Sequence, residues 1–131
     1  MTPGFTKRLV VAAVAIVALG VSSTALAVGG VAGKYAATIR SPAELKGKWV
    51  LTLAGGGSYT VAVNGKLLAR GRYTATPKTI TFSRERGSGC VGNGTYGWLR
   101  SGKTVNFVRK RETASCAGRA AVLSHPFTQV R

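Results

Sequence analysis

The chain alternates apolar and polar residues over two stretches that follow residue 47. Apolar side chains recur at every second position, and a glycine run at residues 55–57 separates the two stretches. A period of two is typical of a β-strand that turns one face to the core. A short glycine-rich connection joins two such strands into a hairpin. The inward positions predicted by this alternation are Trp49, Leu51, Leu53, Tyr59, Val61 and Val63.

Similar alternation continues toward the end of the chain. Asn64-Gly65 predicts a type I′ turn, because both central residues of that turn need a positive φ. Pro126 cannot donate a hydrogen bond to a β-ladder, so it should divide the last segment, residues 120–131, into two short strands. The other strands predicted by alternation cover residues 66–75, 79–83, 95–100 and 103–110.

This succession of elements predicts an all-β fold. No helix of ten residues interrupts the strands, and the connections are too short for parallel crossovers, so neighbouring strands should be antiparallel. We expect an antiparallel up-and-down barrel of seven or eight strands, because closure removes exposed sheet edges. A β-sandwich is the alternative. Ser41-Pro42-Ala43-Glu44 matches a capping box and predicts one short N-terminal helical turn.

The N-terminus has the features of an export signal. Lys7 and Arg8 precede an uncharged, mostly apolar run over residues 9–21, and small residues follow up to Ala27. We expect cleavage after Ala27, which makes residues 1–27 a signal peptide and the protein secreted or cell-surface. An uncleaved membrane anchor is the alternative, because apolar and small residues continue beyond that site. Residues 28–40 are predicted as a flexible linker and residues 41–131 as the barrel domain.

Export changes the interpretation of the two cysteines. Disulfides form and persist in oxidising compartments, so Cys90 and Cys116 are predicted to be bonded to each other. The glycine-rich stretch that follows Cys90 could then shape a binding rim at a barrel mouth, or be only a stapled loop. A zinc site needs about four ligands. Two cysteines and one histidine do not supply them, so we predict no metal.

Residues for catalysis are scarce. The chain has 19 Lys and Arg against three acids, a net charge of +16. The acids are Glu44, Glu85 and Glu112, scattered along the chain, whereas acid–base catalysis and glycoside hydrolysis usually use two or more positioned carboxylates. His125 is the sole histidine, and its neighbours suggest no catalytic pairing. We predict a protein that is not an enzyme and that needs no cofactor.

Aromatic side chains are concentrated at the predicted inward positions. They could form the core of the barrel or line a ligand cavity, since eight-stranded barrels are either filled by side chains or hold one small ligand. The candidate cavity residues are Trp49, Tyr59, Tyr73, Phe82, Tyr96, Trp98 and Phe107.

Basic residues recur on the predicted outer faces and connections. They form either a solvated exterior or a surface that attracts anionic envelope polymers or lipid headgroups. Specific nucleic-acid binding is disfavoured by the export signal, although a basic barrel would retain nucleic acid at low salt. The candidate residues of this surface are Arg70, Arg72, Arg84, Arg86, Arg109, Lys110 and Arg111.

The segment Lys46-Gly47-Lys48-Trp49 resembles the first strand of the calycins, in which Gly-x-Trp follows a short helical turn. The likeness extends through Asn64-Gly65 to Gly71-Arg72-Tyr73. It implies that Trp49 packs at the closed end of a barrel beneath a late basic residue, a part that Arg119 or Arg131 could take. Leu51 stands where the biotin-binding calycins place an Asn, so biotin is not expected.

The resemblance and the inward aromatic residues together suggest a function. We expect a noncatalytic secreted binding module for a small apolar or amphipathic ligand. The alternative is a basic surface protein that adheres to anionic cell-envelope polymers or lipids and holds no ligand in its barrel.

Overall fold

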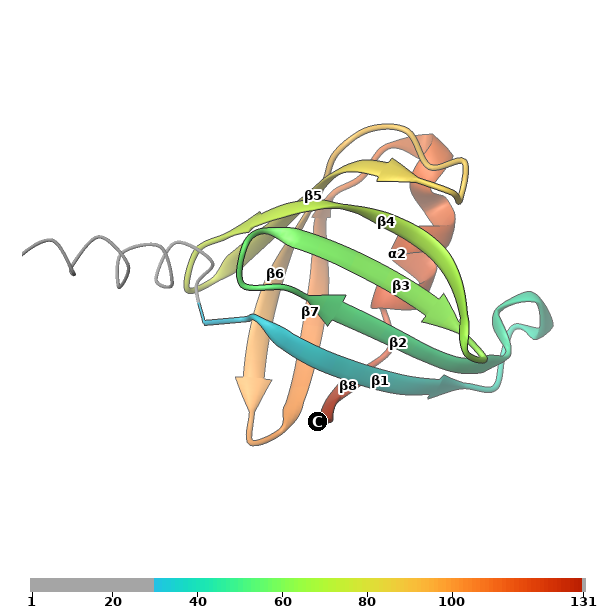
Figure 1. The fold of residues 1–131 in the computed structure, drawn as a ribbon, viewed down its shortest axis with the longest axis horizontal. Coiled ribbons are helices and arrows are strands. Elements are labelled where there is room, and N and C mark those ends of the chain that lie inside the picture. The colour runs from blue at the N-terminus through green and yellow to red at the C-terminus, as the bar shows by residue number, and fades with distance from the viewer. Residues whose placement is uncertain (1–29, 131) are drawn as a thin grey trace, which may run out of the picture.

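Eight antiparallel strands close into a barrel in the computed structural model, which describes residues 30–130 (Figure 1). Each strand pairs with the next, and the last pairs with the first. The predicted all-β up-and-down barrel is therefore confirmed, and the sandwich is wrong. The strands are β1 (Gly33–Ile39), β2 (Gly47–Leu53), β3 (Ser58–Val63), β4 (Lys66–Ala75), β5 (Thr79–Arg86), β6 (Gly94–Ser101), β7 (Thr104–Arg111) and β8 (Phe127–Val130).

The first strand lies where a flexible linker was predicted, so that prediction is wrong for residues 33–39. Tyr35, Ala37 and Ile39 are buried, and β1 pairs with β2 over seven positions and with β8 over three. The small residues of this stretch hid its period of two, because glycine and alanine give little contrast between faces. Burial against both neighbouring strands fixes the segment as the closing strand. The predicted signal peptide, residues 1–27, lies outside the described residues.

The C-terminal segment also differs from the prediction of two strands. Ala117–Leu123 forms helix α2, and only β8 follows it after Pro126. Alanine has the highest helix propensity, and α2 contains three alanines. Val122 and Leu123 turn inward and join the core. The helix lies across one end of the barrel (Figure 1).

The short turns agree with the sequence in position and differ in one detail. A 3-10 turn, η2 (Ala43–Leu45), confirms the predicted helical turn, but Pro42 is its N-cap and no side chain caps it. The capping box is therefore not formed. Asn64 and Gly65 have φ values of 51° and 83°, as the predicted turn requires. A second 3-10 turn, η3 (Ala114–Cys116), leads into α2.

Aromatic side chains from five strands fill the core in edge-to-face contact. Phe82 lies at the centre, with its ring centroid 5.0 Å from that of Tyr59 and 5.9 Å from that of Tyr96. Such pairs add to the free energy gained from burying apolar surface. Among the seven aromatic residues predicted as cavity candidates, Trp98 is the exception, because it is half-buried and donates its Nε1–H to the carbonyl of Thr76.

Candidate functional site

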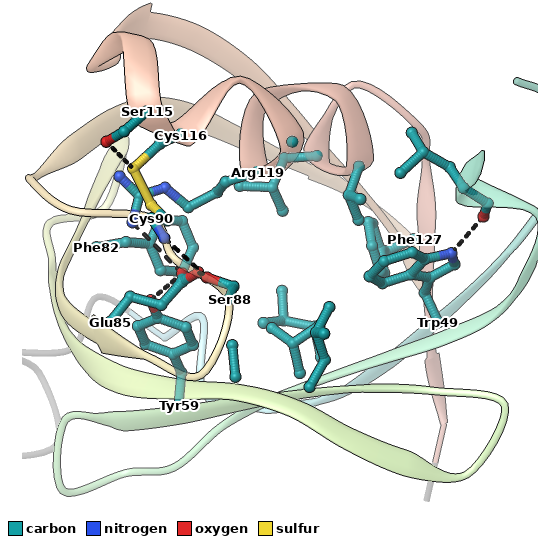
Figure 2. A pocket seen from close by; sticks show the side chains of 18 of the residues that line it. Trp49, Tyr59, Phe82, Glu85, Ser88, Cys90, Ser115, Cys116, Arg119 and Phe127 are labelled. Carbon is teal, nitrogen blue, oxygen red and sulfur yellow. Dashed lines mark hydrogen bonds and ion pairs between the residues drawn. A yellow bond between two sulfur atoms is a disulfide. The ribbon is translucent and has the colours of Figure 1, made fainter.

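A cavity of about 330 Å³ lies at the end of the barrel that α2 and η2 cover (Figure 2). Of the predicted cavity residues, Trp49, Tyr59 and Phe82 line it. The other four predicted cavity residues do not line it. Three of them, Tyr73, Tyr96 and Phe107, are buried in the core, and Trp98 packs at the edge of the core. The remaining apolar wall comes from Leu45, Leu51, Val61, Leu68, Ala69, Val122, Leu123 and Phe127.

A β-bulge in β5 turns a glutamate into this cavity. Ile80 and Phe82 are buried, so regular alternation would send Arg84 inward and Glu85 outward. The register between β4 and β5 shifts between Arg70 and Arg72, and Arg84 adopts a φ of 54°. The extra residue reverses which face the following side chain occupies. As a result Glu85 lines the cavity and Arg84 is exposed.

A second bulge, between β6 and β7, does the same for another glutamate. Val105 and Phe107 are buried, so residues of odd number face inward at the start of β7. The pairing of Tyr96 with Arg109 and of Thr95 with Arg111 skips one residue of β7. After this shift Glu112 faces inward, where its Oε2 accepts a hydrogen bond from the hydroxyl of Tyr96. The two bulges thus re-aim two carboxylates toward one place.

Arg119 of α2 binds both glutamates. Its Nη2 lies 2.6 Å and its Nε 2.8 Å from the two carboxylate oxygens of Glu112, and its Nη1 lies 3.5 Å from Oε1 of Glu85. The side chains of Arg119, Glu85 and Glu112 are only 6%, 5% and 2% exposed. Buried charges persist only when they are paired and hydrogen-bonded. Folding therefore gathers two acids that are scattered along the chain around one guanidinium.

Burial and hydrogen bonds shift the pKa values of groups in this cluster. Burial, followed by the hydrogen bond to Glu85, raises the pKa of Tyr59 well above its ordinary value, so the phenol stays neutral. Burial opposes ionisation of Glu112, but the donors of Arg119 and Tyr96 outweigh it and lower the pKa of Glu112. The carboxylate of Glu85 accepts hydrogen bonds from the hydroxyls of Tyr59, at 2.5 Å, and Ser88.

The disulfide between Cys90 and Cys116 is confirmed and holds this cluster in place. Both cysteines line the cavity, and the bond ties the loop after β5 to the start of α2. Ser88 accepts a hydrogen bond from the Cys90 amide while its hydroxyl donates to Glu85. The glycine-rich stretch after Cys90 contributes no side chain to the cavity lining, so it is the stapled loop of the two alternatives. Gly94 lies so close to Glu112 and Arg119 that an added Cβ would collide with both.

The seven residues of the predicted basic surface are all exposed on the outside of the barrel. They come from β4, β5 and β7. The structure brings Arg70 and Arg86 together as direct neighbours across β4 and β5. Like charges directly opposite each other destabilise a strand pair, so this position would gain from an anion between them.

The resemblance implied that a basic residue covers Trp49. Trp49 is 6% exposed, and its Nε1–H donates to the carbonyl of Leu45 at 2.7 Å (Figure 2). The guanidinium of Arg119 is engaged with the two glutamates instead, and Arg131 lies outside the described residues. The role that the resemblance implied for Arg119 is therefore corrected: its side chain holds the two glutamates in place rather than covering Trp49.

His125 lies two residues after the end of α2, close to the chain's own backbone. Its Nδ1 lies 3.1 Å from the carbonyl oxygen of Ala121 and 3.5 Å from Oγ of Ser124. The hydroxyl of Ser124 donates to the same carbonyl at 2.7 Å. Both side chains thus bind the last turn of the helix.

The fold and the site define a class: a closed eight-stranded antiparallel β-barrel with a disulfide and a cavity at one end. Comparisons with protein-family models, with curated proteins and with solved structures gave no significant match. Within residues 30–130, none of the helices has the length and apolar character needed to cross a membrane. The disulfide points to a compartment outside the cytoplasm.

Proposed function

We propose that this chain is a noncatalytic, calycin-like binding protein that is exported and holds a small amphipathic ligand in the cavity beneath α2. The cavity carries this proposal. Its volume of about 330 Å³ is in the range of small-molecule sites, which run from about 300 to 1,000 Å³. Such sites combine a mostly apolar wall with a few convergent polar groups, and here the polar groups are Tyr59, Glu85, Ser88 and Arg119.

The free energy of binding would come mainly from the apolar wall. Each methylene of a ligand that is buried against Trp49, Phe82 and Phe127 contributes about 0.8 kcal/mol. The wall is also preorganised, because barrel closure, the disulfide and the pairs of Arg119 fix the surrounding side chains before a ligand arrives. A preorganised site loses less conformational entropy on binding.

The test of this proposal uses a neutral apolar fluorophore, N-phenyl-1-naphthylamine. We expect saturable enhancement of its emission by the purified protein, and native mass spectrometry should show one bound molecule per chain. Ala69→Phe places a ring in the cavity wall and should weaken binding about tenfold or more. Ala62→Phe, on the neighbouring strand and away from the cavity, is the matched control. Equal binding by both variants, or none by the natural chain, would contradict the proposal.

A second candidate function rests on the basic exterior. Glu85 and Glu112 are enclosed with Arg119, so they do little to neutralise the exposed cations that face one another at Arg70 and Arg86. This surface would adhere to anionic polymers or lipid headgroups. Sedimentation with phosphatidylglycerol vesicles should fall steeply as salt is raised. Arg70→Gln with Arg86→Gln should weaken it more than Lys34→Gln with Lys103→Gln, and equal losses would leave only nonspecific charge.

A further inference from the structure

Two of the three acids of the sequence line this cavity, and the third pairs with a cation of its wall. Glu44 of η2 lies at the mouth, Glu85 lies in the wall, and Glu112 lies directly behind Arg119. This placement contrasts with 19 Lys and Arg in the sequence, of which Arg119 alone lines the cavity within the described residues. The interior of a strongly basic protein thus carries a local excess of negative charge.

Arg119, the cation of the cavity wall, has few N–H donors left for a ligand. Two N–H groups of Arg119, on Nε and Nη2, bind Glu112, and another on Nη2 binds the carbonyl of Gly92 at 3.1 Å. A fourth points from Nη1 to Glu85. A guanidinium has five N–H donors, so four are used. Arg119 and Glu112 therefore cancel each other's charge within the protein.

Glu85, by contrast, has an unused hydrogen-bond acceptor position. Among residues 30–130, Tyr59 and Arg119 donate to its Oε1, whereas Ser88 alone donates to its Oε2. A carboxylate offers about four acceptor positions, so one on Oε2 remains. Figure 2 shows the carboxylate of Glu85 between Tyr59 and Ser88, at the polar end of the cavity that faces Trp49 and Phe127.

We infer that the cavity selects a cationic amphiphile: a molecule whose protonated amine binds Oε2 of Glu85 and whose apolar tail lies toward Trp49 and Phe127. This inference rests on the proposed ligand-binding function of the same cavity. Hydrogen bonds between charged partners are about twice as strong as neutral ones. A carboxylate headgroup would instead meet Glu85 and Glu44, and Arg119 is already engaged.

The test compares three molecules that share one tail and differ in headgroup charge: decylammonium, decanol and decanoate. Each displaces N-phenyl-1-naphthylamine from the purified protein, below its own micelle concentration. We expect decylammonium to bind about tenfold or more tightly than decanol, because only the ammonium adds Coulomb attraction to its hydrogen bond with the carboxylate of Glu85. Decanoate should bind most weakly.

Variants separate the role of Glu85 from general attraction to acids. Glu85→Gln should remove the preference for decylammonium by weakening its binding about tenfold or more and that of decanol much less, with a melting curve to verify the fold. Glu44→Gln, at the exposed mouth, is the comparison variant and should reduce the preference much less than Glu85→Gln, because exposed charges are screened by solvent.

The outcomes distinguish this inference from the function beneath it. Equal binding of all three molecules, or tightest binding of decanoate, overturns the selection for cations and leaves the cavity proposal standing. If none of the three molecules displaces the fluorophore and the fluorophore itself does not bind, both fail. If Glu85→Gln does not fold, the order of the three molecules on the natural chain still decides.

Discussion

The two ends of the barrel each contain an arginine among tyrosines, and the two arginines have opposite kinds of partner. At the end away from α2, Arg100 donates to the hydroxyl of Tyr35 and to Oε1 of Gln129, both at 2.7 Å. These partners are neutral, and the strands there keep their regular alternation. At the cavity end Arg119 binds two carboxylates that bulges turned inward. Departures from regular strand geometry thus coincide with the charged end that carries the candidate site.

The largest effect should come from removing each arginine in turn. Arg119→Leu leaves Glu85 and Glu112 enclosed without their cation and should cost about 3–5 kcal/mol of unfolding free energy. Arg100→Leu leaves only neutral groups and should cost about 1–2 kcal/mol. Urea denaturation of both variants at neutral pH measures the difference. Equal losses would show that the charge of the partners does not distinguish the two ends.

The disulfide should matter almost as much, and only to the cavity end. Cys90→Ser with Cys116→Ser opens a loop closed by a separation of 26 residues, which should cost about 3 kcal/mol. Because the bond also holds Ser88 and the start of α2, binding of N-phenyl-1-naphthylamine should weaken at temperatures where the variant remains folded. Hydrogen exchange should increase more in α2 than in the β1–β2 pair, because only α2 gains local opening in addition to the loss of global stability. Uniform faster exchange would argue that the bond stabilises the whole barrel equally.

Local properties of the chain were accessible to sequence reasoning, whereas the arrangement of the cavity acids was not. Alternation predicted the bounds of β4 and the Asn64-Gly65 turn, because period and turn chemistry are local properties. Strand β1 was missed because its small residues gave no contrast, and α2 because a short helix was read as strand. The side chain of Glu85 faces inward because Arg84 adopts a positive φ, and the residue type at that position does not predict such a conformation. The predicted disulfide was the sequence signal available for the cavity end, because it places the loop after β5 beside residue 116.

Acid should weaken the cavity end before the other. The pKa of Glu112 is lowered in the folded protein relative to 4.5, despite burial, because Arg119 and Tyr96 donate to its carboxylate. A lowered folded pKa means that this stabilisation is present above about pH 4.5 and is lost as the pH falls toward the folded value. Denaturation midpoints from pH 7 to pH 2 should therefore fall most steeply in that window. Glu112→Gln should flatten this part of the curve, and an unchanged slope would contradict the assignment.

The smallest effect should come from the backbone of the bulge itself. Arg84 adopts a φ of 54°, a left-handed conformation that costs a residue with a side chain about 1–2 kcal/mol relative to glycine. Arg84→Gly should therefore stabilise the protein by up to about 1 kcal/mol after the greater chain entropy of glycine is subtracted. Arg70→Gly, on the paired strand and without a positive φ, should destabilise it by about 0.5–1 kcal/mol. Opposite signs would identify the bulge as strained backbone held in place by the bonds of Glu85 to Tyr59 and Arg119. Destabilisation by both would mean that the Arg84 side chain contributes more than its backbone conformation costs.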